Sequence, residues 1–167
     1  LYQGNADIPE PAFYGMITNI DENFGRLRAN LAALGIEDDT ILIFMTDNGS
    51  SGSCELDGDS FPTRGYNAGL RGKKGSYYDG GHRVPFFVRW PNGQLSGPRD
   101  IEEMALHVDF MPTMIDLCGL TPPTDLHGDG RSLAPLLRGE ADGLPGDRIH
   151  FIQYRQNTNP PEKWENA

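Results

Sequence analysis

Two short segments carry side chains that can bind ions or stabilise charge. In the first segment, Asp47 and Asn48 stand side by side and Gly49 follows them. A carboxylate and a carboxamide offer oxygen ligands, which suit Ca²⁺ or Mg²⁺ and suit Zn²⁺ poorly. The same residues also favour an ordinary turn, because Asp, Asn and Gly are common turn residues. From these residues alone, a metal site and a simple turn both stay open.

The second segment, residues 69–76, reads Gly-Leu-Arg-Gly-Lys-Lys-Gly-Ser. Its glycines let the backbone approach an oxyanion, and Lys73 or Lys74 supplies a positive charge. The segment does not match the phosphate-binding P-loop, which needs Gly where Asn67 stands. A solvated loop that its lysines keep soluble is the alternative. His82 follows closely, and for it both a substrate contact and a structural role stay open.

Several other patterns of metal-binding and catalytic sites do not match this sequence. Asp57 and Asp59 resemble the start of an EF-hand loop, but Pro62 stands where that loop needs Gly. No serine lies in the G-x-S-x-G pattern of a hydrolase triad. Cys54 and Cys118 lack the short spacing of a zinc knuckle, and the sequence does not decide whether they pair.

The composition excludes two classes of partner. The chain of 167 residues carries 24 acidic and 14 basic side chains, which gives a net charge of −10. Nucleic-acid binding needs a clustered basic surface, so we expect no nucleic-acid partner. No apolar run approaches the ~20 residues of a membrane span, so we expect no such span. The length fits one domain of modest size.

The clearest periodic segment is residues 12–34. Its apolar side chains recur at helical spacing, and they are Phe13, Met16, Ile17, Ile20, Phe24, Leu27, Leu31 and Leu34. This 3.6-residue stripe predicts one long helix that packs against a sheet, with Gly35 as its stop. The apolar run 40–46 then predicts a strand buried on both faces. Residues 47–82 lack periodicity and predict a long functional loop.

The rest of the chain alternates short elements with loops. Residues 83–90 predict a second strand, and Asp109 predicts the cap of a short helix. Residues 120–147 predict loop apart from one helical turn at 132–137, and residues 149–154 predict a last strand. A long helix that leads into a buried strand is typical of an α/β fold.

Several blocks of sequence occur in the order found in the type I sulfatases. The blocks are Tyr14 to Asp21, Thr46 to Gly49, Leu70 to Gly75, Asp79 to Pro85, Val108 to Thr113, and Asp129 to Leu133. Over residues 10–160 the chain therefore resembles the later portion of an arylsulfatase catalytic domain. The resemblance implies an α/β fold, a partial alkaline-phosphatase-like sandwich whose mixed sheet is flanked by helices. It assigns residues 1–148 to that portion, and residues 149–167 to the last strand and the start of a C-terminal region.

The resemblance also implies roles for single residues. Asp47 and Asn48 match the two positions that help to bind one Ca²⁺ in the family. Lys74 rather than Lys73 matches the lysine that contacts the sulfate, where it would stabilise charge on the reacting group. His82 stands where the family has an aliphatic residue, and we keep it as a candidate substrate contact.

The family's nucleophile segment, C-x-P-S-R or S-x-P-S-R, does not occur in this sequence. Its first residue becomes formylglycine, so we expect a fragment of a calcium-dependent sulfuric ester hydrolase that is inactive in isolation. The expected substrate of the intact parent is a small sulfate ester or a sulfated glycan. The family leads us to suspect a periplasmic or secreted protein, although the sequence leaves the compartment open.

Two alternatives stay open beside a sulfatase. One is a phosphatase, phosphodiesterase or phosphonate hydrolase of the same superfamily. The other is a non-catalytic remnant that keeps the fold for binding or assembly. In that case, sheet edges and an unpaired apolar helix face would drive self-association.

Overall fold

The structure is a computed structural model that describes residues 1–122, 124 and 128–152. These residues divide into two compact units. The first unit comprises residues 1–35, 43–88 and the described residues that follow 148. The second comprises residues 36–42 and 89–148. Within the described ranges, no helix has both the length and the apolar character that crossing a bilayer requires.

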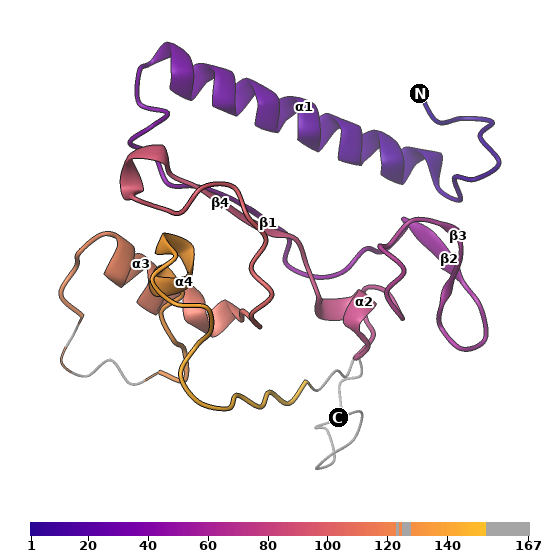
Figure 1. Cartoon of the computed structure of the whole chain (residues 1–167). Coiled ribbons are helices and arrows are strands. Elements are labelled where there is room, and N and C mark those ends of the chain that lie inside the picture. Colours follow the sequence, from indigo (N-terminus) through magenta and orange to yellow (C-terminus); the bar gives the residue numbers. More distant parts are fainter. Residues whose placement is uncertain (123, 125–127, 153–167) are drawn as a thin grey trace. The chain divides into compact units, whose positions relative to one another are not determined.

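The first unit is built on helix α1, Pro11–Ala33, the long helix in Figure 1. The predicted helix over residues 12–34 is confirmed. Pro11 occupies the first turn, where a missing backbone N–H costs nothing. Gly35 follows with φ of +69°, the left-handed conformation in which glycine commonly ends a helix.

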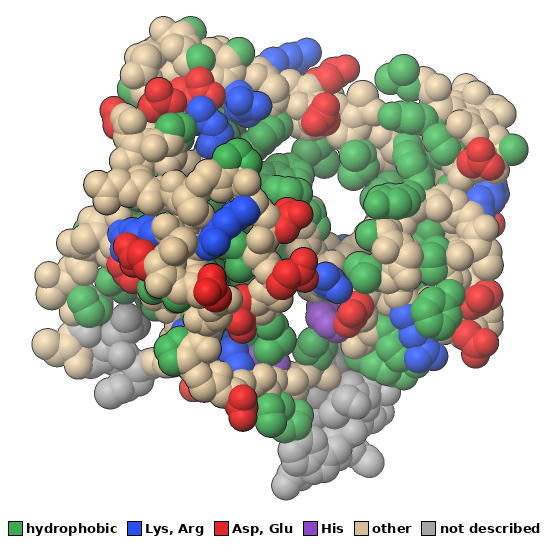
Figure 2. Space-filling view, in the orientation of Figure 1, with side chains coloured by type: hydrophobic (Ala, Val, Ile, Leu, Met, Phe, Trp, Pro, Cys, Tyr) green, Lys and Arg blue, Asp and Glu red, His purple; other side chains and the backbone are tan. Residues whose placement is uncertain are grey.

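The apolar stripe of α1 is only partly covered. The ring of Phe24 packs edge-on against that of Phe44, with ring centroids 5.3 Å apart. Along the same stripe, however, the side chains of Met16 and Ile17 remain 58% and 49% exposed. No residue of α1 is fully buried. Figure 2 likewise shows hydrophobic side chains at the surface among the charged ones.

Strands β1, Leu42–Met45, and β4, Phe86–Arg89, pair in a two-stranded sheet. Both predicted strands are confirmed, but each is shorter than the runs 40–46 and 83–90. The prediction that the first strand is buried on both faces is wrong, because β1 is half-buried and Met45 is 45% exposed. The physical reason is that an apolar strand becomes fully buried only where other elements pack on both of its faces, and β1 is only partly covered.

The prediction of one long loop over residues 47–82 is also wrong. This region contains an antiparallel hairpin of β2, Cys54–Leu56, and β3, Pro62–Gly65, and then the short helix α2, Asp79–His82. The two strands of three and four residues are too short to show a period of two in the sequence.

The hairpin is held together at its turn and at its middle. At the turn, the Asp57 carboxylate accepts the backbone N–H groups of Asp59 and Phe61 at 3.0 and 2.8 Å. Asp57 therefore closes a turn, consistent with the rejection of an EF-hand. In the middle, Arg64 pairs with Glu55 directly across the strands at 2.8 Å.

Where the structure describes it, the second unit contains two α-helices and two short 3₁₀ segments. They are η1, Pro91–Gly93; η2, His107–Asp109; α3, Phe110–Leu117; and α4, Ala134–Arg138. The short helix predicted after Asp109 and the helical turn predicted at 132–137 are both confirmed. Leu117 of α3 and Leu136 of α4 are buried, as is Leu133 just before α4.

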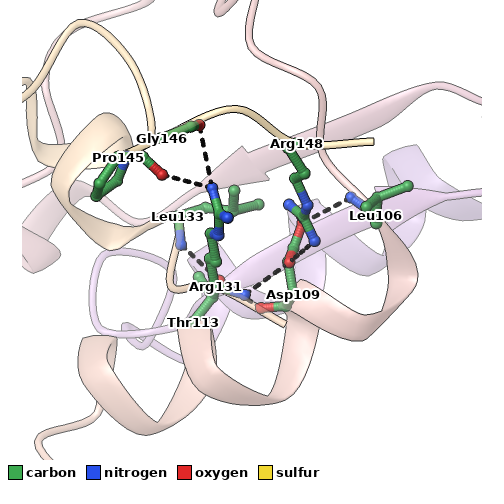
Figure 3. A network of polar contacts seen from close by, with 8 residues as sticks. All are labelled: Leu106, Asp109, Thr113, Arg131, Leu133, Pro145, Gly146 and Arg148. Atoms are coloured by element: carbon green, nitrogen blue, oxygen red, sulfur yellow. Dashed lines mark hydrogen bonds and ion pairs between the residues drawn. The ribbon is translucent and has the colours of Figure 1, made fainter. Parts of the chain in front are cut away.

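Asp109 is fully buried and organises a polar network at the start of α3, shown in Figure 3. Its carboxylate accepts two hydrogen bonds from the guanidinium of Arg148, at 2.6 and 2.7 Å. It also accepts the backbone N–H groups of Leu106 and Arg131, both at 2.8 Å. The predicted helix cap is therefore corrected: Asp109 is the N-cap residue, but its side chain accepts these four hydrogen bonds from three residues instead of bonds from the amides of α3.

Thr113 extends this network to the next segment of the chain. Its hydroxyl donates to the backbone oxygen of Asp109 at 2.6 Å and accepts the N–H of Leu133 at 2.9 Å. Because Thr113 is also buried, these bonds tie α3 to the segment that leads into α4.

The predicted last strand at 149–154 is not a strand where the structure describes it. Residues 149–152 form no regular element. Residues 153 and 154 lie outside the described residues.

Candidate active site

Asp47 and Asn48 follow β1 after one intervening residue, Thr46, at the end where the strand leaves the sheet. The carboxylate-bearing residue Asp47 is exposed, and Asn48 is half-buried. The hydroxyl of Thr46 donates to the backbone oxygen of Asn48 at 3.1 Å and holds the turn. The oxygen atoms of both side chains are thus carried on a short, ordered turn at the end of a strand.

The backbone after this turn contacts two other segments of the first unit. Gly49 donates its N–H to the oxygen of Gly81 at 2.9 Å. One residue later, the oxygen of Ser50 accepts the N–H of Lys74 at 2.8 Å. The strand end, the lysine-containing loop and α2 therefore meet through main-chain hydrogen bonds.

Glycines make this meeting possible because the three backbones almost touch. A Cβ atom on Gly49 would lie 1.8 Å from the oxygen of Gly80, and one on Gly80 would lie 2.1 Å from the oxygen of Gly72. A Cβ on Gly81 would lie 2.0 Å from the oxygen of Ser76. Real Cβ atoms do not come this close to other heavy atoms, so a side chain at any of the three positions would push the segments apart.

The two neighbouring lysines have different surroundings. Lys73 is half-buried and lines a cavity of about 400 Å³ together with Phe13, Met16 and Glu55. Lys74 is exposed, and its backbone is bound to the strand end as described above. The sequence alone does not show that Lys73 is half-buried and Lys74 exposed, because the direction of each side chain depends on the local backbone conformation.

His82 ends α2 next to the glycine contacts. Its Nε2 lies 3.8 Å from a carboxylate oxygen of Asp79, which is beyond hydrogen-bond distance. Its Nδ1 is buried and has no hydrogen-bond partner among the described residues. The imidazole, whose side chain is 33% exposed, thus keeps unused hydrogen-bonding capacity.

One side-chain contact in this region was not predicted from the sequence. The guanidinium of Arg71 stacks on the ring of Tyr78, 3.7 Å from its centroid. An arginine before a glycine-rich loop and a tyrosine after it are a usable signal, because stacking needs only a cation and an aromatic ring at the two ends of a loop.

The two cysteines, whose pairing the sequence left open, are both free. Cys54 is buried in β2, whereas Cys118 is exposed after α3.

Two solved structures share the architecture of this chain. A solved structure bound to its substrate D-glucosamine-2-N,6-O-disulfate aligns with a TM-score of 0.59 and 25% identity, over 86% of this chain and 26% of that one. A second, phosphonate monoester hydrolase SpPMH from Silicibacter pomeroyi, aligns with a TM-score of 0.54 and 26% identity, over 79% of this chain and 22% of that one. The α/β fold is therefore that of the alkaline-phosphatase-like proteins, as predicted.

Residues 10–120 match the Sulfatase family, and the chain belongs to that family. Steryl-sulfatase of Mus musculus is 36% identical over 150 residues, which cover 84% of this chain and 24% of that protein. The chain spans about a quarter of the length of the curated relatives it matches. The resemblance inferred from the ordered sequence blocks is confirmed.

Sulfatases in general use a metal ion and a formylglycine. Among the described residues, no group of three or more His, Cys, Asp or Glu side chains is placed to hold a metal ion. Asp47 and Asn48 provide the hard oxygen atoms that a cation such as Ca²⁺ prefers. The residues present therefore fit a part of a coordination shell, and further ligands are needed to complete it.

Proposed function

We propose that these residues form the later portion of a sulfatase catalytic domain, which hydrolyses sulfate esters when the formylglycine segment is also present. One observation carries the proposal. The hydrogen bond from the N–H of Lys74 to the oxygen of Ser50 brings the lysine loop to the strand end that bears Asp47 and Asn48. In α/β sheets, ligands bind beyond the carboxyl ends of strands, which supports a site at this strand end.

Asp47 and Asn48 are the proposed ligands of Ca²⁺. The ion takes six to eight oxygen ligands at about 2.3–2.6 Å, so two side chains supply only part of its shell. The bound ion would supply positive charge against the sulfate oxygens. The half-buried position of Asn48 and the exposed position of Asp47 leave both side chains accessible to ligands from outside the described residues.

Lys74 is the proposed electrostatic group of the site. When a sulfate ester is hydrolysed, the bond from sulfur to the ester oxygen breaks and that oxygen takes up negative charge. An ammonium group fixed nearby stabilises this charge more in the transition state than in the substrate. The exposed side chain of Lys74, on a backbone fixed at Ser50, supports this role better than the half-buried Lys73.

His82 is proposed as a substrate contact. The partly exposed imidazole supports the proposal, because its Nε2 lies beyond hydrogen-bond distance of the Asp79 carboxylate and can bind a ligand.

Lys74→Ala should lower kcat for 4-nitrophenyl sulfate by about 10²–10³-fold, the usual loss when one charge-stabilising group is removed. The measurement requires a protein in which a formylglycine segment precedes these residues. Lys73→Ala is the matched control, and it should change the rate by about twofold or less, because its half-buried side chain lines the cavity with Phe13 and Met16 and has no proposed role at the site. Equal losses in the two variants would contradict the role given to Lys74, and turnover by the 167-residue chain alone would contradict the need for the missing nucleophile.

The substrate class is proposed from the chemistry of the relatives. One solved neighbour is bound to a disulfated glucosamine, and the mouse relative is named for a steryl sulfate. Either a sulfated glycan or a small sulfate ester therefore suits the proposed site.

Phosphonate ester hydrolysis is the second candidate. The phosphonate monoester hydrolase among the structural neighbours favours it, because the same fold there acts on a phosphorus centre. Turnover of a phenyl phosphonate ester that exceeds turnover of the sulfate ester would favour this candidate. Stoichiometric zinc in the purified protein would favour a two-metal phosphatase instead.

A non-catalytic assembly role makes a different prediction. The exposed apolar side chains of α1 should make the 167-residue chain self-associate, since apolar patches in water drive association. Ile17→Glu together with Ile20→Glu should shift the chain towards monomer in analytical ultracentrifugation, whereas Asn19→Glu on the polar face should not. A chain that is already a monodisperse monomer would count against self-association through this helix.

A further inference from the structure

The side chains of Arg71 and Tyr78 meet across the base of the loop formed by residues 72–77, which carries Lys74. The guanidinium carbon of Arg71 lies 3.7 Å from the centroid of the Tyr78 ring and 5.5 Å from that of Phe61. Both distances are within the range in which a cation is attracted to the face of an aromatic ring. The cation is thus shared between two rings.

Further bonds fix the first end of this loop to the hairpin turn. The Nε of Arg71 donates to the backbone oxygen of Asp59 at 2.9 Å. The N–H of Gly72 donates to the oxygen of Ser60 at 2.7 Å. The side-chain amide of Asn67 donates to the oxygen of Gly72 at 3.0 Å. These bonds leave the Arg71 end with little freedom to move relative to the hairpin.

The second end of the loop is joined to the first. The backbone oxygen of Arg71 accepts the N–H of Gly80 at 2.7 Å, while its side chain holds the ring of Tyr78. Arg71 therefore binds both the residue before α2 and a residue within α2. Closing a loop at its base restricts the conformations of every residue inside it, Lys74 included.

We propose that the Arg71–Tyr78 stack positions Lys74, by holding the loop of residues 72–77 against the strand end at Gly49 and Ser50. Arg71 is thus a positioning residue for the lysine that contacts the sulfate, and this part of the inference rests on the proposed function. A direct contact between Arg71 and the substrate is a weaker account. The guanidinium already has two ring faces and a backbone oxygen as partners.

Amide hydrogen exchange of the 167-residue chain, followed by NMR, tests the positioning without any turnover. Tyr78→Ala and Arg71→Ala should each speed exchange at the N–H groups of Lys74 and Gly80 by roughly tenfold, because the loop opens more often without the stack. Tyr78→Phe keeps the ring and should leave both rates unchanged. The N–H of Tyr66, bound to the oxygen of Ser53 at 2.9 Å in the same unit, reports on unfolding of that unit and should not change in any variant.

Three outcomes would overturn the proposal. The first is unchanged exchange at Lys74 and Gly80 in Tyr78→Ala. The second is an equal acceleration at Tyr66, which would mean general destabilisation of the first unit. The third is a Tyr78→Phe variant that behaves like Tyr78→Ala.

A kinetic readout separates this proposal from the function of the site. In a protein with the formylglycine segment, Arg71→Ala should lower kcat for 4-nitrophenyl sulfate by about tenfold and change KM little. It should have almost no further effect once Lys74 is alanine, because the two changes remove the same interaction. If exchange responds as predicted but Lys74→Ala retains full activity, then the stack positions the loop and the proposed function is wrong.

Discussion

Asp109→Ala is expected to destabilise the second unit by about 3–5 kcal/mol, the usual cost of removing one partner from a buried ion pair. The side chain of Arg148 is only 8% exposed, so its charge would remain without either water or a carboxylate. The backbone N–H groups of Leu106 and Arg131 would lose their acceptor at the same time. Urea denaturation followed by circular dichroism measures the loss, and a unit that no longer folds would show it as lost dispersion of its NMR signals.

Asp116→Ala is the matched control for this experiment. Asp116 also lies in α3 and also pairs with an arginine, Arg138, at 3.1 Å. Both side chains are partly exposed, at 39% and 25%, so water can replace the lost partner. The variant should lose about 1 kcal/mol or less. Similar losses of stability in the Asp109 and Asp116 variants would show that the buried ion pair stabilises the unit no more than the exposed one does.

The same pair predicts how stability depends on pH. Burial alone would raise the pKa of Asp109, but the hydrogen bonds from Arg148, and then those from the backbone of Arg131 and Leu106, outweigh it and lower the pKa below its usual 3.8. A carboxylate whose pKa is lower in the folded state stabilises the fold above the unfolded pKa. This contribution is lost as the pH falls below 3.8 through the folded pKa. Asp109→Ala should lack that part of the acid transition.

Gly80→Ala should separate the lysine loop from α2 and cost about 3 kcal/mol, the upper part of the range for overpacking. The new Cβ would lie 2.1 Å from the oxygen of Gly72 and 2.7 Å from the oxygen of Arg71. Both are backbone atoms, so no side-chain rotation relieves the contact. Hydrogen exchange at the N–H of Lys74 should speed up strongly in this variant, because its bond to Ser50 depends on the same packing.

Gly25→Ala is the control substitution for this prediction. Nothing lies within 4 Å of a Cβ at this position, which is in the middle of α1. Alanine favours a helix over glycine, so this variant should become more stable by up to about 1 kcal/mol. If Gly80→Ala behaves like Gly25→Ala, the close approach of the three backbones does not exist in solution.

The elements that could be predicted from the sequence are those with a strong local signal. The stripe from Phe13 to Leu34 repeats for six turns, so its helix was predicted to within one residue at each end. The apolar run of β1 placed Asp47 at the end of a strand for the same reason. The ordered sequence blocks identified the family because several short matches in order are far more specific than any one of them.

What the sequence could not show depends on contacts between distant residues. Asp109 reads as a helix cap because aspartate favours that position, but Arg148, 39 residues later, binds its carboxylate instead. The strand from Leu42 was predicted as fully buried because its composition is apolar. An apolar composition indicates that a strand can be buried on both faces. Whether it is buried depends on which helices and strands pack against it.

The glycines at 72 and 80 illustrate the same limit. Glycine-rich segments in a basic loop favour an anion cradle on the basis of sequence. In the structure, Gly72 and Gly80 let two backbone segments pack together, with the N–H of Gly80 bound to the oxygen of Arg71. Lys74, which is exposed beside this contact, is the lysine whose charge an anion could reach more easily.

A crystal structure with Ca²⁺ and sulfate, from a protein that carries these residues behind a formylglycine segment, would show whether Asp47, Asn48 and Lys74 form one site. We expect Ca²⁺ at about 2.3–2.6 Å from oxygen atoms of Asp47 and Asn48, and the sulfate within hydrogen-bond distance of the Lys74 ammonium. A calcium ion bound elsewhere, or a Lys74 side chain that points away from the sulfate, would contradict such a site.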